Sequence, residues 1–267
     1  MSPPLSAWVA GVGLLGPGLP DWPAAVEVLA GRAPYQPSAT VIPPLQCLPP
    51  AERRRTGKVV RLALTVGLEA VARAGADAAQ LPAVFSSSGG DGENCHEICQ
   101  VLAGAERQIS PTRFHNSVHN AASGYWGIAT GATPAVNALC AHDASFAAGL
   151  LESLVQLSID ETAVLLIAYD ADYPQPMRAA RPIPDAFGVA LLLTPAAGPT
   201  SLARITVRGV AATAQTLPDA QLEALRAQVP AARSLPLLQC LARARPGTVA
   251  IDYLEEQRVT IEVSPCP

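Results

Sequence analysis

The chain has 267 residues, a formal net charge of −4, and 49% hydrophobic against 15% charged residues. That composition fits one compact α/β domain with a large buried surface. A single lysine among eighteen basic residues, and no basic stripe carrying aromatic side chains, argues against nucleic-acid binding. The sequence has no apolar run of about eighteen residues and no charged leader, so we expect a cytoplasmic protein without a membrane span.

The first third of the chain predicts alternating strands and helices. We expect a strand at Ala7–Leu15, a helix over Asp21–Ala30, a proline-rich loop over Gly31–Pro50 and the longest helix over Ala51–Ala74.

Basic side chains crowd the first turns of that longest helix, where positive charge opposes the helix dipole. They are Arg53, Arg54, Arg55 and Lys58. One interpretation is a solvated face; the other is a docking patch for an acidic carrier protein or a cofactor phosphate.

The middle of the chain begins with a strand over Ala83–Ser88 and a helix over Glu93–Ala103. The segment from Ser110 to Glu152 follows. It predicts a polar turn, a short helix opened by Ser117, a buried strand at Pro134–Leu139, a sharp turn at Cys140–Asp143 and a helix from Ala144.

The last third opens with a continuous apolar run, Thr162–Tyr169, which predicts a central strand buried on both faces. Asp170 and Asp172 follow it and are interpreted as loop residues. Further expected elements are strands at Asp185–Thr194 and Arg204–Val210, helices at Pro218–Gln228 and Leu235–Ala244, and a hairpin of Val249–Tyr253 with Arg258–Val263. This alternation predicts a single layered α/β domain, 1–267, with a mainly parallel sheet.

Cysteine and histidine gather in one window of the sequence. Cys95 and Cys99, with His115 and His119, have a spacing that can place metal ligands on helix faces. Ser117, at an expected helix start between the two histidines, argues against that arrangement, so no metal and no cofactor is expected. The irregular spacing of the six cysteines predicts free thiols in a reducing compartment.

Cys140 lies where a strand passes through a turn into a helix. Free N–H groups at a helix start lower the pKa of a thiol there, which suits a nucleophile. With His142 or His119 as the base, Cys140 would support an acyltransferase or thioesterase.

Several of these segments resemble the N-terminal half of β-ketoacyl synthases, which have a thiolase-like fold. The resemblance is carried by Pro111, Phe114, Asn120, Val136–Gly149, Val84–Gly90, Phe187–Thr194 and Ile205–Gly209. It implies an α/β thiolase-like fold of the N-terminal half only, followed by a short extension of helices and a hairpin.

The resemblance also implies chemistry that this chain lacks. The family decarboxylates malonyl units with two histidines from its second half, and no histidine follows His142. The matched elbow position falls on Ala141, and Cys140 precedes it on the strand, where a one-residue slip reverses the face. We therefore expect no catalytic residue in the chain.

What remains resembles a chain-length-factor-like subunit of aryl polyene-type pathways. The resemblance implies a heterodimer with a β-ketoacyl-ACP synthase, with an acyl carrier protein reached indirectly. The expected interface or acyl-tunnel residues are Phe114, His119, Asn120, Tyr125, Trp126, Asn137, Cys140, Ala141 and Phe146, the bulk of Tyr125, Trp126 and Phe146 limiting chain length.

Two alternatives stay open beside the subunit: the Cys140-dependent enzyme, and a stand-alone acyl or lipid-binding module. Local roles also compete at single residues. Asn116, Asn120 and Asn137 suit caps or turns, and His142-Asp143 suits a helix cap.

Overall fold

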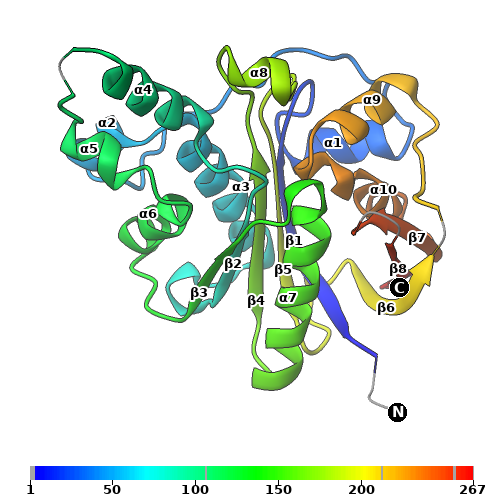
Figure 1. Ribbon diagram of the computed structural model, residues 1–267. Coiled ribbons are helices and arrows are strands. Elements are labelled where there is room, and N and C mark those ends of the chain that lie inside the picture. The colour runs from blue at the N-terminus through cyan, green and yellow to red at the C-terminus, as the bar shows by residue number, and fades with distance from the viewer. Residues whose placement is uncertain (1–3, 106, 212, 255–256, 267) are drawn as a thin grey trace.

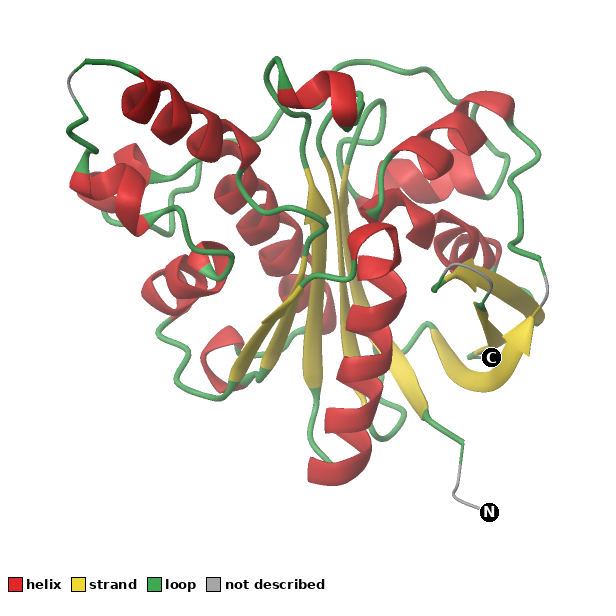
Figure 2. Ribbon diagram, viewed as in Figure 1, coloured by secondary structure: helices red, strands yellow, loops and turns green. Residues whose placement is uncertain are grey.

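The computed structural model describes residues 4–105, 107–211, 213–254 and 257–266; the two ends of the expected domain, 1–3 and 267, lie outside them. In this part of the chain one mixed sheet of eight strands runs through the molecule, with helices on both faces (Figures 1 and 2). Its order is β3-β2-β4-β5-β1-β6-β8-β7. The strands are β1 (Ser6–Leu15), β2 (Ala83–Ser86), β3 (Val136–Leu139), β4 (Val164–Asp170), β5 (Phe187–Thr194), β6 (Ala203–Ala211), β7 (Gly247–Asp252) and β8 (Arg258–Pro265).

The expectation of a mainly parallel sheet was wrong. Only two pairs of strands, β2 with β3 and β2 with β4, are parallel, and the other five pairs are antiparallel. The reason is the position of β5, which runs against β4 and β1 and lies between them. Alternating elements predict a layered domain, but they do not determine the direction in which a strand enters the sheet.

Helices cover both faces of the sheet. They are α1 (Trp22–Leu29), α2 (Pro50–Arg55), α3 (Lys58–Ala74), α4 (Gly92–Ala103), α5 (Pro111–His115), α6 (Ala121–Thr130), α7 (Ser145–Asp160), α8 (Met177–Ala180), α9 (Ala220–Gln228) and α10 (Leu235–Arg243), with 3₁₀ turns η1 (Ala78–Gln80), η2 (His142–Ala144) and η3 (Ala231–Ser234). One core joins the sheet to α3 and α6, and the other joins it to α1, α7, α9 and α10.

Helix α3 lies directly on β1 because glycine removes the side chains between them. A Cβ at Gly13 would lie 1.9 Å from the carbonyl oxygen of Val66, and one at Gly11 would lie 2.2 Å from that of Ala70. Larger residues at either position would force the helix off the sheet.

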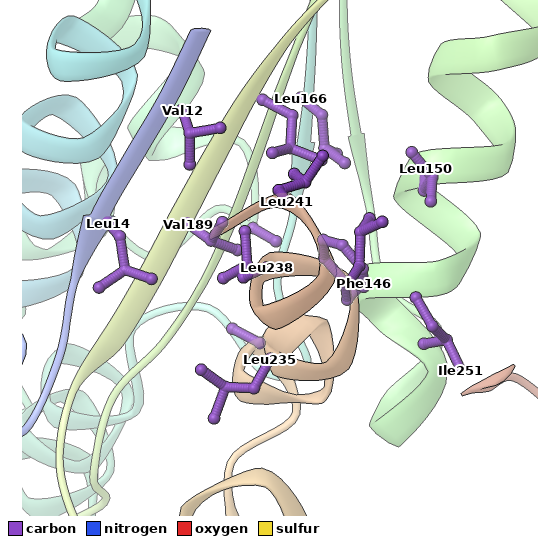
Figure 3. Packing of buried hydrophobic residues seen from close by; sticks show 14 of the residues in the cluster. Val12, Leu14, Phe146, Leu150, Leu166, Val189, Leu235, Leu238, Leu241 and Ile251 are labelled. Carbon is purple, nitrogen blue, oxygen red and sulfur yellow. The ribbon is translucent and has the colours of Figure 1, made fainter. Parts of the chain in front are cut away.

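The C-terminal extension, from α9 to β8, belongs to the main core. In Figure 3, Leu235 and Leu238 of the extension lie near Val189 of the sheet, and Phe146 of α7 closes the same cluster. All four side chains are at most 1% exposed. The extension therefore covers an apolar sheet face, and burial on this scale is the dominant stabilising contribution.

The expected long helix was also wrong in its bounds. Thr56 is extended and Gly57 is the N-cap of α3, so the segment forms two helices. Arg53, Arg54 and Arg55 consequently lie in the last turn of α2, where positive charge stabilises the helix dipole instead of opposing it.

Two local expectations in the middle segment also failed. Ser117 does not open a helix: its hydroxyl donates to the Phe114 carbonyl at 2.8 Å, and α6 begins at Ala121. The strand at Pro134–Leu139 is shortened to β3 and is half exposed instead of buried, because it is an edge strand.

Candidate functional site

The turn between β3 and α7 forms a tight elbow. His142 adopts a left-handed backbone (φ 51°), and the Ala141 amide donates to the Ser145 hydroxyl at 3.1 Å. That hydroxyl in turn donates to the His142 carbonyl at 2.7 Å. Asp143 does not cap α7 as expected, because its carboxylate turns away to bind two arginines.

Those arginines come from distant parts of the chain. Arg181 follows α8 and donates to Asp143 Oδ1 at 2.5 Å, and Arg233 of η3 donates to Oδ2 at 2.9 Å. Burial alone would raise the pKa of Asp143, but the Arg181 hydrogen bond and the charges of both arginines hold it below its usual value. The elbow is thereby fastened to the C-terminal extension.

Cys140 reaches the elbow without a base. Its exposed thiol donates to the Ser88 carbonyl at 3.1 Å. His119 Nε2 lies 3.2 Å from the Ser87 carbonyl, and His142 Nε2 lies 3.0 Å from Arg181 Nη1. Among the described contacts neither imidazole bonds to the thiol, so the nucleophile–base pair that thiol catalysis requires is not assembled here.

Asp170 was interpreted as a loop residue and is instead the buried last residue of β4. Its Oδ1 accepts from the Ser88 amide at 2.8 Å and the Ser88 hydroxyl at 2.6 Å, and its Oδ2 accepts from the Ala231 amide at 2.9 Å. Burial raises its pKa to about 6, against the effect of these hydrogen bonds. Asp170 therefore joins the loop after β2, the end of β4 and η3. Asp172 forms an ion pair with Lys58.

The space between the ends of β2 and β4 is filled by a tyrosine. A Cβ at Gly89 would lie 1.9 Å from the Tyr173 hydroxyl oxygen, so the glycine-rich strand end packs directly on this ring. A hollow of about 460 Å³ does lie beside the elbow, lined by Ala141–Ala144 and by residues of η3 and the hairpin, but Cys140 does not line it.

No metal site is assembled from the four suspected ligands. Among the residues described, no group of three or more histidine, cysteine or acidic side chains could hold an ion. His115 packs edge-on against Tyr125, while His119 turns to Ser87. Cys95 and Cys99 are exposed on α4, and all six cysteines are free thiols.

Tyr125, Trp126 and Phe146 were expected at an interface or acyl tunnel, and the structure buries them within the chain at 1%, 0% and 1% exposure. Trp126 packs edge-on against Phe85, with ring centroids 6.3 Å apart. These side chains therefore offer no surface to a partner. They support α6 and α7 from beneath.

The asparagines are local structural residues. Asn116 donates to the Arg55 carbonyl at 2.7 Å and accepts from the Tyr125 hydroxyl at 3.2 Å. Asn120 stands at the N-cap of α6 without a side-chain capping bond, and Asn137 donates to Glu152 at 2.9 Å across the surface between β3 and α7.

Exposed apolar side chains lie on the elements before and after β3, the strand at one end of the sheet order. Its outer side has no strand partner within the described residues, and Figure 1 shows it between α6 and α7. Phe114 is 68% exposed, Ile128 49% and Ile159 73%. We call this region the edge surface: β3 together with Phe114, Val118, Ile128, Val155 and Ile159. An unpaired strand flanked by apolar side chains is typical of an interaction site.

The four basic candidates divide into two groups. Arg53 donates to Gln46 and to the Leu48 carbonyl, and Lys58 pairs with Asp172, so both are used within the chain. Arg54 and Arg55 line a hollow of about 410 Å³ beside α5, where Arg55 also forms an ion pair with Glu52 at 3.1 Å.

The sheet order β3-β2-β4-β5-β1, with β5 reversed, and the strand–elbow–helix unit define a thiolase-like ketosynthase fold. The family model described as "Beta-ketoacyl synthase, N-terminal domain" matches residues 29–251, and the chain belongs to this family. No curated protein matches the sequence. Among the described residues, no helix has both the length and the apolar character needed to cross a bilayer.

Solved structures similar to this chain include three complexes. A chain of the ketosynthase ApeO in complex with its chain length factor ApeC, from Xenorhabdus doucetiae, aligns with a TM-score of 0.74 and 23% identity over 97% of this chain and 99% of that one. The ishigamide ketosynthase/chain length factor aligns at 0.71 and 14%, covering 98% and 100%. AntDE:AntF, a type II polyketide ketosynthase with its acyl carrier protein, aligns at 0.71 and 10%, covering 99% and 100%.

Sequence reasoning missed two features of this site, both carboxylates. Asp170 and Asp143 find their partners at residues 88, 181, 231 and 233, and no local pattern in the sequence connects those positions. The acidic residue after an apolar strand was the one available signal for Asp170.

Proposed function

We propose that this protein is a non-catalytic subunit that pairs with a β-ketoacyl-ACP synthase and acts as its chain length factor, in an aryl polyene-type or related pathway. The observation that carries the proposal is the edge surface, which lies next to an elbow that has no base for its thiol. The partner binds the open side of β3, and the elbow region then forms part of the wall of the partner's acyl tunnel.

The hydrogen-bond pattern of β3 supports strand addition. The carbonyls of Ala135 and Leu139 accept from β2, at Ala83 and Ser87. In a parallel pair, alternate residues face the neighbouring strand, so Val136 and Ala138 direct their amides and carbonyls to the open side. A partner strand paired there satisfies these groups and covers the flanking apolar side chains.

The extent of the structural alignments also supports a subunit. It aligns with nearly whole chains of the three complexes but with only 45% of a bacillaene-synthase ketosynthase. No histidine follows His142, so the chain itself offers no second pair of imidazoles for decarboxylation. In this proposal the partner supplies the catalytic cysteine and both histidines.

The acyl carrier protein meets the complex through the partner, with Arg54 and Arg55 as the contribution of this chain. These two guanidinium groups lie beside α5, which carries Phe114 of the edge surface. An acidic carrier that docks near the subunit boundary would therefore meet positive charge here.

The test is a pair of proline substitutions on one strand, followed by co-expression with ketosynthases from the same genome and size-exclusion chromatography. Ala138→Pro removes an amide on the open side, and we expect it to weaken the complex roughly a hundredfold, or about 3 kcal/mol. Asn137→Pro removes an amide directed to β2, and it should destabilise the isolated subunit instead.

Two results would overturn the proposal. One is that no ketosynthase co-elutes with the unmodified chain. The other is an acyl adduct on Cys140 after incubation with acyl-carrier thioesters, detected by mass spectrometry, which would favour the thiol-dependent acyltransferase or thioesterase.

A further inference from the structure

The elbow is fastened to the C-terminal extension by a charged cluster that the chemistry of acyl transfer does not require. We call it the Asp143 clamp: Asp143, with Arg181 on one carboxylate oxygen and Arg233 on the other. The Arg181 and Arg233 side chains are 24% and 19% exposed, and the Asp143 side chain is 35% exposed. Charge-assisted hydrogen bonds in partly buried positions are stronger than those at an open surface.

The clamp continues into a network within the extension. Arg233 Nη1 lies 3.9 Å from Asp252 of β7, and Asp252 binds Arg226 of α9 at 2.7 Å. Arg226 also binds Glu223 at 2.7 Å. A line of alternating charges thus runs from the elbow through η3 to the edge of the sheet that lies farthest from β3.

The elbow needs such support because its backbone includes a residue in an unfavourable conformation. His142 has φ 51°, a conformation that costs a non-glycine residue free energy and persists only where its surroundings hold it. Asp143 is the next residue, so a force on its carboxylate acts directly on the turn. His142 Nε2 also lies 3.0 Å from Arg181 Nη1, which adds a second contact to the same guanidinium.

We propose that Asp143 is a positioning residue whose clamp sets the place of the elbow against the C-terminal extension, and thereby the depth of the acyl tunnel in the complex. Only the claim about the depth of the acyl tunnel rests on the proposed function. The extension fixes the elbow in the subunit alone, and the consequence for product length appears when a ketosynthase is bound.

The first measurement uses the isolated subunit. Asp143→Asn should speed hydrogen exchange at the amides of Ala141 and Ala144 roughly tenfold, because the turn opens more often when its anchor is lost. Arg181→Gln and Arg233→Gln each remove one arm and should give smaller increases. The matched control is Arg208→Gln, which breaks the ion pair to Glu262 on β6 and β8 and should leave both amides unchanged.

The second measurement uses the complex and the product lengths it releases, read by mass spectrometry. Asp143→Asn should leave the affinity for the ketosynthase unchanged and shift the product distribution, whereas Arg208→Gln should shift neither. A double-mutant cycle of Asp143→Asn with Arg233→Gln should be non-additive, because both act on one contact.

Unchanged exchange at Ala141 and Ala144 in Asp143→Asn would overturn the clamp. Faster exchange with an unchanged product distribution in an intact complex would overturn its role in the tunnel. If no ketosynthase binds the unmodified chain, the proposed function fails, and the exchange comparison still decides whether the clamp exists.

Discussion

The two edges of the sheet are treated differently by this chain. At the β7 edge, the Gln215 amide donates to the Ala250 carbonyl at 2.9 Å, and Asp252 is held by Arg226 and Arg258 at 2.7 and 2.9 Å. At the β3 edge, no strand pairs with the outer side within the described residues, and the elements before and after β3 carry exposed apolar side chains.

The difference shows which edge of the sheet this chain covers with its own residues. An exposed strand edge invites pairing with other chains, and proteins usually cover or charge such edges. Here Gln215, just before the C-terminal extension, covers the β7 edge, and arginines of the extension place charge on it. The β3 edge has neither protection, which supports its assignment to a partner.

The largest expected effect concerns the support of the open edge. Trp126→Ala should lower the free energy of unfolding by about 3 to 5 kcal/mol, measured by urea unfolding of the isolated subunit, because it empties a buried site between α6 and α3. Trp126→Phe keeps most of the ring and should cost less. A loss below about 1 kcal/mol for the alanine variant would show that α6 does not anchor this edge.

Phe114→Ala tests the surface of the same edge. It should reduce binding of the ketosynthase and leave the stability of the subunit almost unchanged. The ring is 68% exposed, so the stability of the subunit should change by less than about 0.5 kcal/mol. Affinity for the ketosynthase, measured by calorimetry, should fall by about 2 kcal/mol, as for an aromatic anchor. The control is Val41→Ala, which truncates a residue 80% exposed on the 31–49 loop. Equal binding by both variants would exclude Phe114 from the interface.

The covered edge can be probed through pH, because Asp170 holds η3 of the extension. Its pKa is raised to about 6 in the folded chain, so the folded state binds this proton more tightly than the unfolded chain does. Its contribution to stability is present below about pH 4 and is lost as pH rises through about 6, with a slope of up to about 1.4 kcal/mol per pH unit.

In Asp170→Asn this component should vanish, so the stability difference from the wild type should change with pH between about 4 and 6. Asp143 has a lowered pKa and contributes the opposite slope, but it is common to both proteins and cancels in the comparison. Urea unfolding across this range checks the prediction. Parallel stability curves would contradict it.

The smallest effect is expected at the hydrogen bond that covers the β7 edge. Gln215→Pro removes the amide that bonds to Ala250 and should lower subunit stability by about 1 kcal/mol without weakening the ketosynthase complex. Ala138→Pro, by contrast, should weaken the complex with the ketosynthase. Loss of the complex in Gln215→Pro would mean that the partner uses this edge as well.

Local patterns predicted most of the elements. Apolar runs marked β1, β4 and β5 closely, and the helix expected over Pro218–Gln228 is α9, whose N-cap Asp219 accepts from two backbone amides. The terminal hairpin was confirmed as β7 and β8. These features depend on neighbours in sequence.

The predictions that failed depend on contacts between residues far apart in the sequence. Gly57 was read as part of one helix, although it stands beside the Asp91 carboxylate, where a Cβ would lie 2.4 Å from Oδ2. β3 has an apolar composition but lies at an edge, and burial of Tyr125, Trp126 and Phe146 follows from helix packing. The resemblance located the elbow, whereas its fastening by Arg181 and Arg233 required the structure.

One feature of the topology bears on how the molecule is made. β1 leaves the ribosome before β5 and β6, the strands with which it pairs, and Trp8 must find Thr194, 186 residues further along. Until that later part is synthesised, the first strand is an apolar segment without a neighbour. Pairing over such a separation is slow and exposes chains to aggregation, so soluble yield should depend on slow translation and chaperones.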